Sequence, residues 1–131
     1  MRTFADTSSL YALLVANDKG HQRAKAAFHR LASEAAELVT SSFVLVETIA
    51  LLQRRVGLSA VRDFQARLFP LLEVVWINRD WYRRGVERLY AEQSRHLSLV
   101  DCLSFEIMQA LEIETAFACD RHFSEAGFTL L

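Results

Sequence analysis

Four acidic side chains occupy positions where a folded protein normally places apolar ones. Asp6 and Asp120 each follow a short apolar stretch. Glu47 interrupts the run FVLVETIALL, and Asp101 interrupts LSLVDCLSF. An ionised carboxylate is costly to bury unless it is paired or bound to a metal ion. These four acids are therefore the residues of this chain best suited to chemistry.

Four carboxylates brought together would repel one another and raise one or more of their pKa values. A divalent cation relieves that repulsion, and oxygen ligands without an organised His or Cys suit Mg²⁺ or Mn²⁺. Such ions activate water for attack on phosphorus and stabilise the charge that develops on the leaving oxygen. The acids therefore predict metal-dependent hydrolysis of phosphodiester bonds.

Helix capping is the structural alternative for three of the acids. Asp6 could cap the helix that follows it, Asp120 could cap a short turn, and Ser98 with Asp101 has the S-x-x-D spacing of a capping box. Glu47 has no capping role and no Lys or Arg three or four residues away. Its neighbours at those spacings are all apolar, so we expect it to project from an apolar helix face. Together, the four acids favour a shared pocket over four unrelated structural roles.

The elements that position these acids alternate between short apolar strands and amphipathic helices. The expected strands are Thr3–Ala5, Leu38–Thr40, Glu73–Ile77, Thr115–Cys119 and Phe128–Leu131. The expected helices are Leu10–Val15, His21–Ala36, Phe43–Val56, Leu58–Leu72, Asp80–Ala91 and Leu99–Leu111. This alternation predicts an α/β fold with a parallel sheet of about five strands covered on both faces. In such sheets, sites form beyond the carboxyl ends of the strands.

Composition bounds the remaining possibilities. A chain of 131 residues with 52% hydrophobic residues fits one domain, residues 1–131, around a core. The net charge of -1 argues against a generic basic nucleic-acid binder, although 13 of the 15 cationic residues are Arg, which suits phosphate contacts. No apolar run reaches the roughly 18 residues of a membrane span, and the two cysteines lack CxxC spacing. We therefore expect a soluble, cytoplasmic protein.

Other catalytic motifs are missing. The chain has no Gly-rich phosphate loop, GxSxG elbow or HExxH. Its four histidines are scattered, and His96 and His122, which adjoin the acidic motifs, are interpreted as surface residues. The acids therefore carry the functional prediction alone.

Four segments, FADTSS, SSFVLVETIALLQRR, LSLVDCLSF and ACDRHFSEAGF, together resemble the PIN-domain family, particularly its VapC-type toxins from bacterial toxin–antitoxin pairs. The resemblance covers essentially the whole chain. It implies a three-layer α/β/α fold and a Mg²⁺- or Mn²⁺-dependent endoribonuclease that cuts RNA, such as tRNA or rRNA. It also implies a homodimer, which we expect to form through Phe43–Val56 or Leu58–Leu72, and a small antitoxin protein that blocks the site.

The resemblance also implies roles for particular residues. Asp6 and Asp101 resemble the principal metal ligands, with Glu47 and Asp120 completing the catalytic pocket. Three hydroxyl residues are expected to orient these acids: Thr7, Ser8 and Ser98. Four arginines near the motifs are candidate RNA phosphate contacts: Arg54, Arg55, Arg95 and Arg121.

Two other functions are compatible with these residues. One is a PIN-type nuclease of RNA processing or repair that has no antitoxin. The other is a non-catalytic domain whose acidic pocket docks a basic peptide. The intact four-acid set argues against docking, because a docking surface has no need of metal-ligand geometry.

Overall fold

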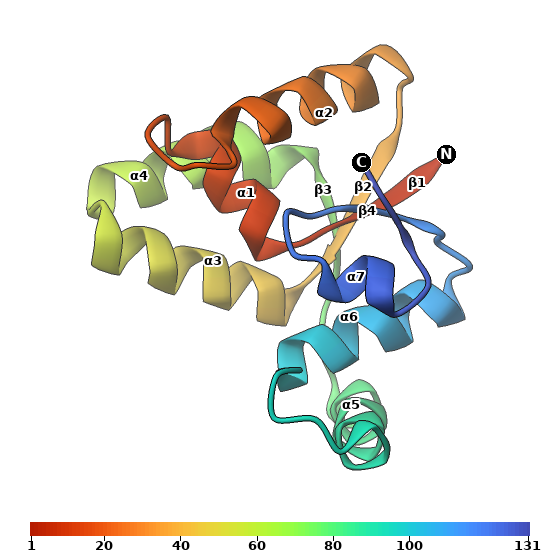
Figure 1. Cartoon of the computed structure of the whole chain (residues 1–131). Helices are drawn as coiled ribbons and strands as arrows, with labels where there is room; N and C mark the ends of the chain where they lie inside the picture. Colours follow the sequence, from red (N-terminus) through yellow and green to blue (C-terminus); the bar gives the residue numbers. More distant parts are fainter.

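A computed structural model describes residues 1–131 and contains a five-stranded parallel sheet with helices on both sides (Figure 1). Its strands are β1 (Arg2–Ala5), β2 (Glu37–Ser41), β3 (Leu72–Val75), β4 (Thr115–Phe117) and β5 (Thr129–Leu130). The strand order is β3-β2-β1-β4-β5, and every neighbouring pair is parallel. The predicted parallel α/β fold is confirmed, and each of the five expected strands is present within a few residues of its expected bounds.

The helices are α1 (Thr7–Leu14), α2 (His21–Ser33), α3 (Ser42–Arg55), α4 (Leu58–Asp63), α5 (Arg79–Glu92), α6 (Leu99–Ala110) and α7 (His122–Glu125). The chain builds the sheet outward from β1, first through β2 to β3 and then through β4 to β5. Because crossovers are right-handed, this reversal places the two sets of helices on opposite faces. Figure 1 shows α1 to α4 on one side of the strands and α5 to α7 on the other.

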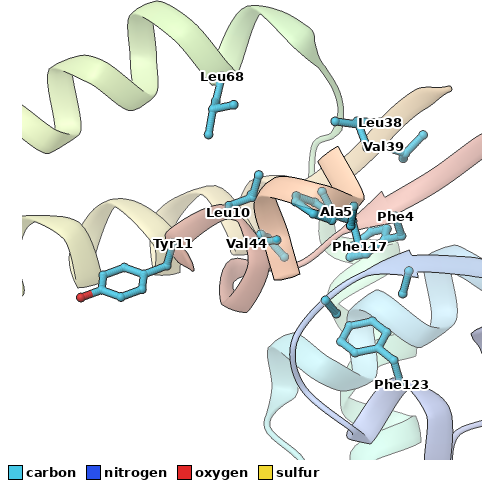
Figure 2. Packing of buried hydrophobic residues seen from close by; sticks show 14 of the residues in the cluster. Phe4, Ala5, Leu10, Tyr11, Leu38, Val39, Val44, Leu68, Phe117 and Phe123 are labelled. Atoms are coloured by element: carbon cyan, nitrogen blue, oxygen red, sulfur yellow. The ribbon is translucent and has the colours of Figure 1, made fainter. Parts of the chain in front are cut away.

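The core fills the space between the sheet and both helical layers (Figure 2). Phe4 and Phe117 on neighbouring central strands are fully buried, as are Leu10 on α1 and Val44 on α3. On the opposite side, the buried ring of Phe123 on α7 packs against those of Phe4 and Phe105. Both central strands are thus held between apolar layers, which fixes the positions of the residues at their carboxyl ends.

The segment expected as one helix over Leu58–Leu72 is not continuous. It forms α4, then a π-helical turn at Phe64–Leu68 and a 3-10 turn at Phe69–Leu71. Pro70 lies in the 3-10 turn, where its missing N–H and rigid ring prevent a return to α-helix. No helix in the structure has both the length and the apolar character needed to span a membrane.

Candidate active site

Two of the four acids follow the paired strands at the centre of the sheet. The Asp6 N–H donates to the carbonyl oxygen of Phe117 at 3.0 Å, so the β1–β4 pairing continues up to Asp6. Asp120 lies three residues beyond Phe117. After β1 the chain turns toward the α1–α4 side, whereas after β4 it turns toward α7. Asp6 and Asp120 therefore flank the switch point at which this sheet architecture forms its sites.

A cavity of about 440 Å³ opens at this edge of the sheet. All four predicted acids line it: Asp6, Glu47, Asp101 and Asp120. Also lining it are the three expected hydroxyl residues, Thr7, Ser8 and Ser98, together with Ala50, Leu51 and Arg54. The expected gathering of the four acids is thus what the structure contains. One guanidinium faces four carboxylates, which makes the cavity strongly acidic.

Asp6 is the most buried of these acids, with 5% of its surface exposed. Its Oδ2 accepts hydrogen bonds from Ser8 N at 3.2 Å and Ser8 Oγ at 2.7 Å. Burial raises the pKa of the Asp6 carboxyl from 3.8 to about 6; the Ser8 hydrogen bonds oppose the shift, and the nearby Asp101 and Glu47 charges add to it. Asp6 caps α1, so the capping role considered for it in the sequence is confirmed. Its Oδ1 accepts no hydrogen bond within the chain. Capping therefore leaves one oxygen for another partner.

Hydroxyl groups join the elements that carry the acids. Ser8 Oγ donates to Asp6 and also accepts from Cys119 N at 3.0 Å, which links α1 to the end of β4 beside Asp120. The buried hydroxyl of Thr7 lies 3.0 Å from that of Thr48 and donates to Val44 O at 3.3 Å, which joins α1 to α3. Sequence analysis did not single out Thr48. Its position directly after Glu47 was the available signal.

Asp101 also combines capping with a place in the cavity. Ser98 Oγ accepts from Asp101 N at 3.1 Å, and Asp101 Oδ2 accepts from Ser98 N at 3.2 Å, which completes the predicted capping box of α6. As with Asp6, one carboxylate oxygen of Asp101 has no hydrogen-bond donor in the chain. The turn cap expected at Asp120 also forms, because Asp120 Oδ1 accepts from His122 N at 2.9 Å. The three capping alternatives are therefore correct locally and still compatible with a ligand.

Glu47 differs from its prediction. It lies on α3 at the cavity, but it is exposed, as are its neighbours Val46 and Ala50. Of the apolar neighbours one turn away, Val44 is buried and Leu51 is half-buried, but they do not enclose the Glu47 side chain. The expectation that Glu47 projects from an unsolvated apolar face is therefore wrong, although the expected place in the acidic cavity is not.

His122 was misjudged as a surface histidine. Its Nδ1 lies 3.2 Å from Asp120 Oδ2 and 3.5 Å from Asp101 Oδ2. That nitrogen is buried and has no hydrogen-bond partner, because these contacts lack hydrogen-bond geometry. The expectation that no histidine accompanies the acids is wrong, since α7 turns His122 back toward Asp120. The signal was its position two residues after Asp120.

The four candidate phosphate-binding arginines separate in space. Arg54 lines the acidic cavity. Arg55 lies over the ring of Tyr11, with 5.5 Å between its Cζ and the ring centre. Arg121 pairs with Glu125 at 3.3 Å and lines a neighbouring cavity instead. Arg95 is exposed in the loop between α5 and α6. The structure thus brings only Arg54 together with the acids.

The donor atoms fit a divalent cation. Ligand atoms of Asp101, Asp120 and His122 all lie within 4.8 Å of one another. Asp6 and Glu47 line the same region, and free oxygens on Asp6 and Asp101 together with the unpartnered Nδ1 of His122 can turn to an ion. A cation here would offset the repulsion and the burial cost that raise the Asp6 pKa.

Comparison with known proteins gives consistent results. The family model of the PIN domain matches residues 3–129. The chain is 38% identical over 126 residues to the 23S rRNA-specific endonuclease VapC20 of Mycobacterium tuberculosis, covering 95% of this chain and 94% of that protein. The crystal structure of M. tuberculosis VapC20, described as a sarcin–ricin loop cleaving toxin, matches with a TM-score of 0.83 at 36% identity. That match covers 97% of this chain and 96% of the other.

Proposed function

The chain belongs to the PIN domain family, and on this premise we propose that it is a metal-dependent endoribonuclease acting as the cytoplasmic toxin of a toxin–antitoxin pair. One observation carries the proposal: a single cavity gathers four carboxylates from four separate parts of the chain. Family membership supplies the reaction class, and the cavity supplies the groups that such a reaction needs.

In this proposal Asp6, Asp101 and Asp120 hold the metal, with Glu47 completing the pocket directly or through water. When bound, the ion supplies an activated water for attack on phosphorus and stabilises negative charge on the phosphate. Ser8 and Ser98 orient the carboxylates through the hydrogen bonds described above. Arg54 lines the cavity and would contact a phosphate oxygen of the RNA.

We propose Mg²⁺ or Mn²⁺ as the ion, because the donors are mainly carboxylate oxygens. His122 refines this proposal. Mg²⁺ takes oxygen ligands almost exclusively, whereas an imidazole nitrogen is better suited to transition metals. If Nδ1 of His122 contributes to binding, activity should be higher with Mn²⁺ than with Mg²⁺, and His122→Ala should narrow that difference.

The proposed substrate is based on the similarity to VapC20. Its name specifies 23S rRNA and its structure is described as that of a sarcin–ricin loop cleaving toxin. We therefore propose ribosomal RNA as the substrate class, with a hairpin carrying that loop as the first RNA to test.

The partner proposals have separate support. Exposed apolar side chains on the two helices expected at a homodimer interface, including Val46 on α3 and Leu58 on α4, are available for contact with a second copy. An antitoxin would act by covering the acidic cavity. Gel filtration of the purified protein at micromolar concentration tests the dimer, and a monomer would contradict it.

The central experiment incubates antitoxin-free protein with ribosomal RNA and tRNA in Mn²⁺, Mg²⁺ or EDTA, with Asp6→Asn alongside. We expect discrete cuts in ribosomal RNA that need both metal and Asp6. As a matched control, Asp18→Asn changes an aspartate outside this cavity that accepts from Gly20 N at 2.8 Å, and should leave cleavage unchanged. Cleavage by Asp6→Asn at the wild-type rate would contradict the proposed function. Growth inhibition that a co-expressed neighbouring antitoxin gene relieves would separate a toxin from an RNA-processing nuclease.

A further inference from the structure

A second cavity lies beside the acidic one, because residues next in the chain to Ser98 and Asp120 line it. It has a volume of about 490 Å³ and is enclosed by α5, the loop that follows α5, α6 and α7. Its apolar lining comes from Leu97, Phe105 and Ala126, and polar groups come from Ser94, His96 and His122 among others. Its volume is of the order usual for ligand pockets, but most of its lining residues are polar or charged. None of the four carboxylates that hold the metal in our proposal lines this cavity.

His122 joins the two cavities. Its ring lines the second cavity, while its Nδ1 lies 3.2 Å from Asp120 Oδ2 and 3.5 Å from Asp101 Oδ2. The second cavity therefore begins one imidazole ring away from the acids. A group bound there would belong to the substrate whose phosphate lies at the acids, on that phosphate's own nucleotide or the next.

The charges of the second cavity do not favour a phosphate. Its two arginines are already paired: Arg121 with Glu125 at 3.3 Å, and Arg88 with Glu106 at 2.9 Å. Glu92 and Glu125 also line the cavity. The lining is thus close to neutral, in contrast to the four carboxylates next door. A neutral group with flat apolar faces and polar edges suits this lining better than an anion or a cation.

A nucleobase has these properties. Sequence-selective RNA recognition usually takes unstacked bases from loops, stacks them on aromatic or imidazole rings and bonds their polar edges. The ring of Phe105 is completely buried beneath Arg88, whose Cζ lies 5.2 Å from the ring centre, so the rings open to a base are those of His96 and His122. The exposed His96 stands in the loop Gln93–Leu97, where its backbone N–H donates to Ser94 Oγ at 3.0 Å. Arg88, Glu92 and Ser94 provide donors and acceptors for the edge of a base.

We propose that this second cavity binds an unstacked base of the RNA substrate beside the scissile phosphate, and so contributes to target choice. The inference rests on the proposed ribonuclease function, because it assumes that RNA occupies the acidic cavity. It assigns selectivity to α5, α7 and the loop Gln93–Leu97, and it leaves phosphodiester hydrolysis to the acids.

The test uses a fluorescent RNA hairpin carrying the sarcin–ricin loop, and a series in which each nucleotide near the mapped cut is made abasic in turn. Binding is measured by anisotropy in EDTA, and cleavage in Mn²⁺. We expect one abasic position to weaken wild-type binding and to raise KM by about tenfold, the usual effect of losing one stacked base. Ala126→Phe, which fills the cavity, and His96→Ala, which removes a ring, should raise KM for intact RNA by a similar factor with kcat little changed.

The decisive comparison combines both changes. On the RNA with the critical abasic position, Ala126→Phe and His96→Ala should cause no further loss, because the group they contact is already missing. Ala26→Phe, an equal enlargement at an exposed position of α2, is the control and should behave as wild type. His96→Ala keeps the test valid if Ala126→Phe fails to fold.

Several results would overturn the proposal. The proposal would be wrong if Ala126→Phe and His96→Ala both had the wild-type KM. It would also be wrong if these variants raised KM equally for the intact and the abasic RNA. If the two variants cut RNA normally but were no longer inhibited by an antitoxin, the cavity would bind a peptide of the antitoxin and not a base. Failure of the proposed function is separate: the wild type would cut no RNA in Mn²⁺, whereas the base-dependent binding in EDTA would still be measurable.

Discussion

The acidic cavity has two walls that are built differently. The first wall, at the start of α1, consists of the buried Asp6 and Thr7 and the half-buried Ser8, which donates a hydrogen bond to Asp6. The second wall, at the start of α6 and just before α7, consists of Asp101 and Asp120, with His122 beside them, and is only partly buried. Burial has raised the pKa of Asp6, whereas the second wall places three donors within 4.8 Å of one another. Ionisation of Asp6 in the first wall thus destabilises the folded protein, whereas the second wall supplies donor atoms that are accessible to solvent.

The largest expected effect tests whether both walls are needed for catalysis. Asp6→Asn and Asp101→Asn should each lower kcat/KM for RNA cleavage by at least about 100-fold, because each removes a charge that holds the metal in the proposed function. Initial rates in Mn²⁺ with a fluorescent RNA measure this loss. Glu87→Gln, at an exposed position of α5, is a control that should stay within about twofold of wild type. A variant of either wall with wild-type rates would show that the other wall is sufficient.

The second prediction separates the walls by stability in the absence of metal. Asp6 has a pKa of about 6 when folded and an ordinary value of 3.8, so its ionisation destabilises the folded state. This cost is absent below about pH 4, grows between pH 4 and pH 6 and stays constant above. Asp6→Asn should therefore raise the free energy of unfolding in EDTA by up to about 3 kcal/mol at pH 7.5, and by little at pH 4.

Urea unfolding at both pH values, with Asp120→Asn alongside, measures the difference. Asp120 is more exposed than Asp6, so its substitution should change the free energy of unfolding by no more than about 0.5 kcal/mol. Equal gains from both substitutions would contradict the distinction between the walls. Adding Mn²⁺ should make the wild type more stable to unfolding than Asp6→Asn, because in the proposed function the folded wild type binds the ion more tightly than the variant does.

The third prediction concerns the support of the second wall. A Cβ added at Gly85 on α5 would lie 2.6 Å from Leu103 Cγ on α6, which is closer than two carbons can approach. Gly85→Ala should therefore force α5 and α6 apart and cost about 1 to 3 kcal/mol of stability. Thermal unfolding measures this cost. If the melting temperature rises instead, as helix propensity alone would predict, then the two helices are not tightly packed.

The smallest expected effect comes from the capping box. Ser98→Ala removes the acceptor for Asp101 N and should cost about 1 kcal/mol of stability. We expect cleavage to fall only a few fold, because Asp101 keeps its charge and loses part of its orientation. Ser33→Ala, at the exposed end of α2, is the matched control. A loss as large as that of Asp101→Asn would place Ser98 in the catalytic machinery itself.

Much of the cavity could be predicted because local patterns and topology agree. A carboxylate directly after an apolar strand, as at Asp6, must lie at the carboxyl end of that strand. Parallel strands bring those ends to one edge, so the meeting of Asp6 with Asp120 follows from the alternation of strands and helices. The S-x-x-D spacing likewise predicted the bond between Ser98 and Asp101, which depends on one helical turn only.

The misjudged residues depend on which elements pack against one another. Glu47 has apolar neighbours along α3, but its exposure depends on the absence of a covering element, and no local pattern records that. His122 lies two residues beyond Asp120, and only the direction of α7 decides whether its ring faces solvent or Asp101. Pro70 predicted an interruption in Leu58–Leu72, but the α-helix already ends at Asp63, before a π-helical turn whose Phe64 and Leu68 are buried in the core.

The amino-acid sequence by itself determined the parallel α/β fold, the four acids and the edge of the sheet where they gather. These depend on hydrophobic periodicity and on the fixed direction of parallel strands, which short segments encode. Tertiary structure alone decided that Asp6 is buried while Glu47 is exposed, that His122 faces Asp101 and Asp120, and that a near-neutral cavity adjoins the acidic one. Those properties belong to the contacts between α3, α5, α6 and α7, and such contacts exist only when distant segments pack together.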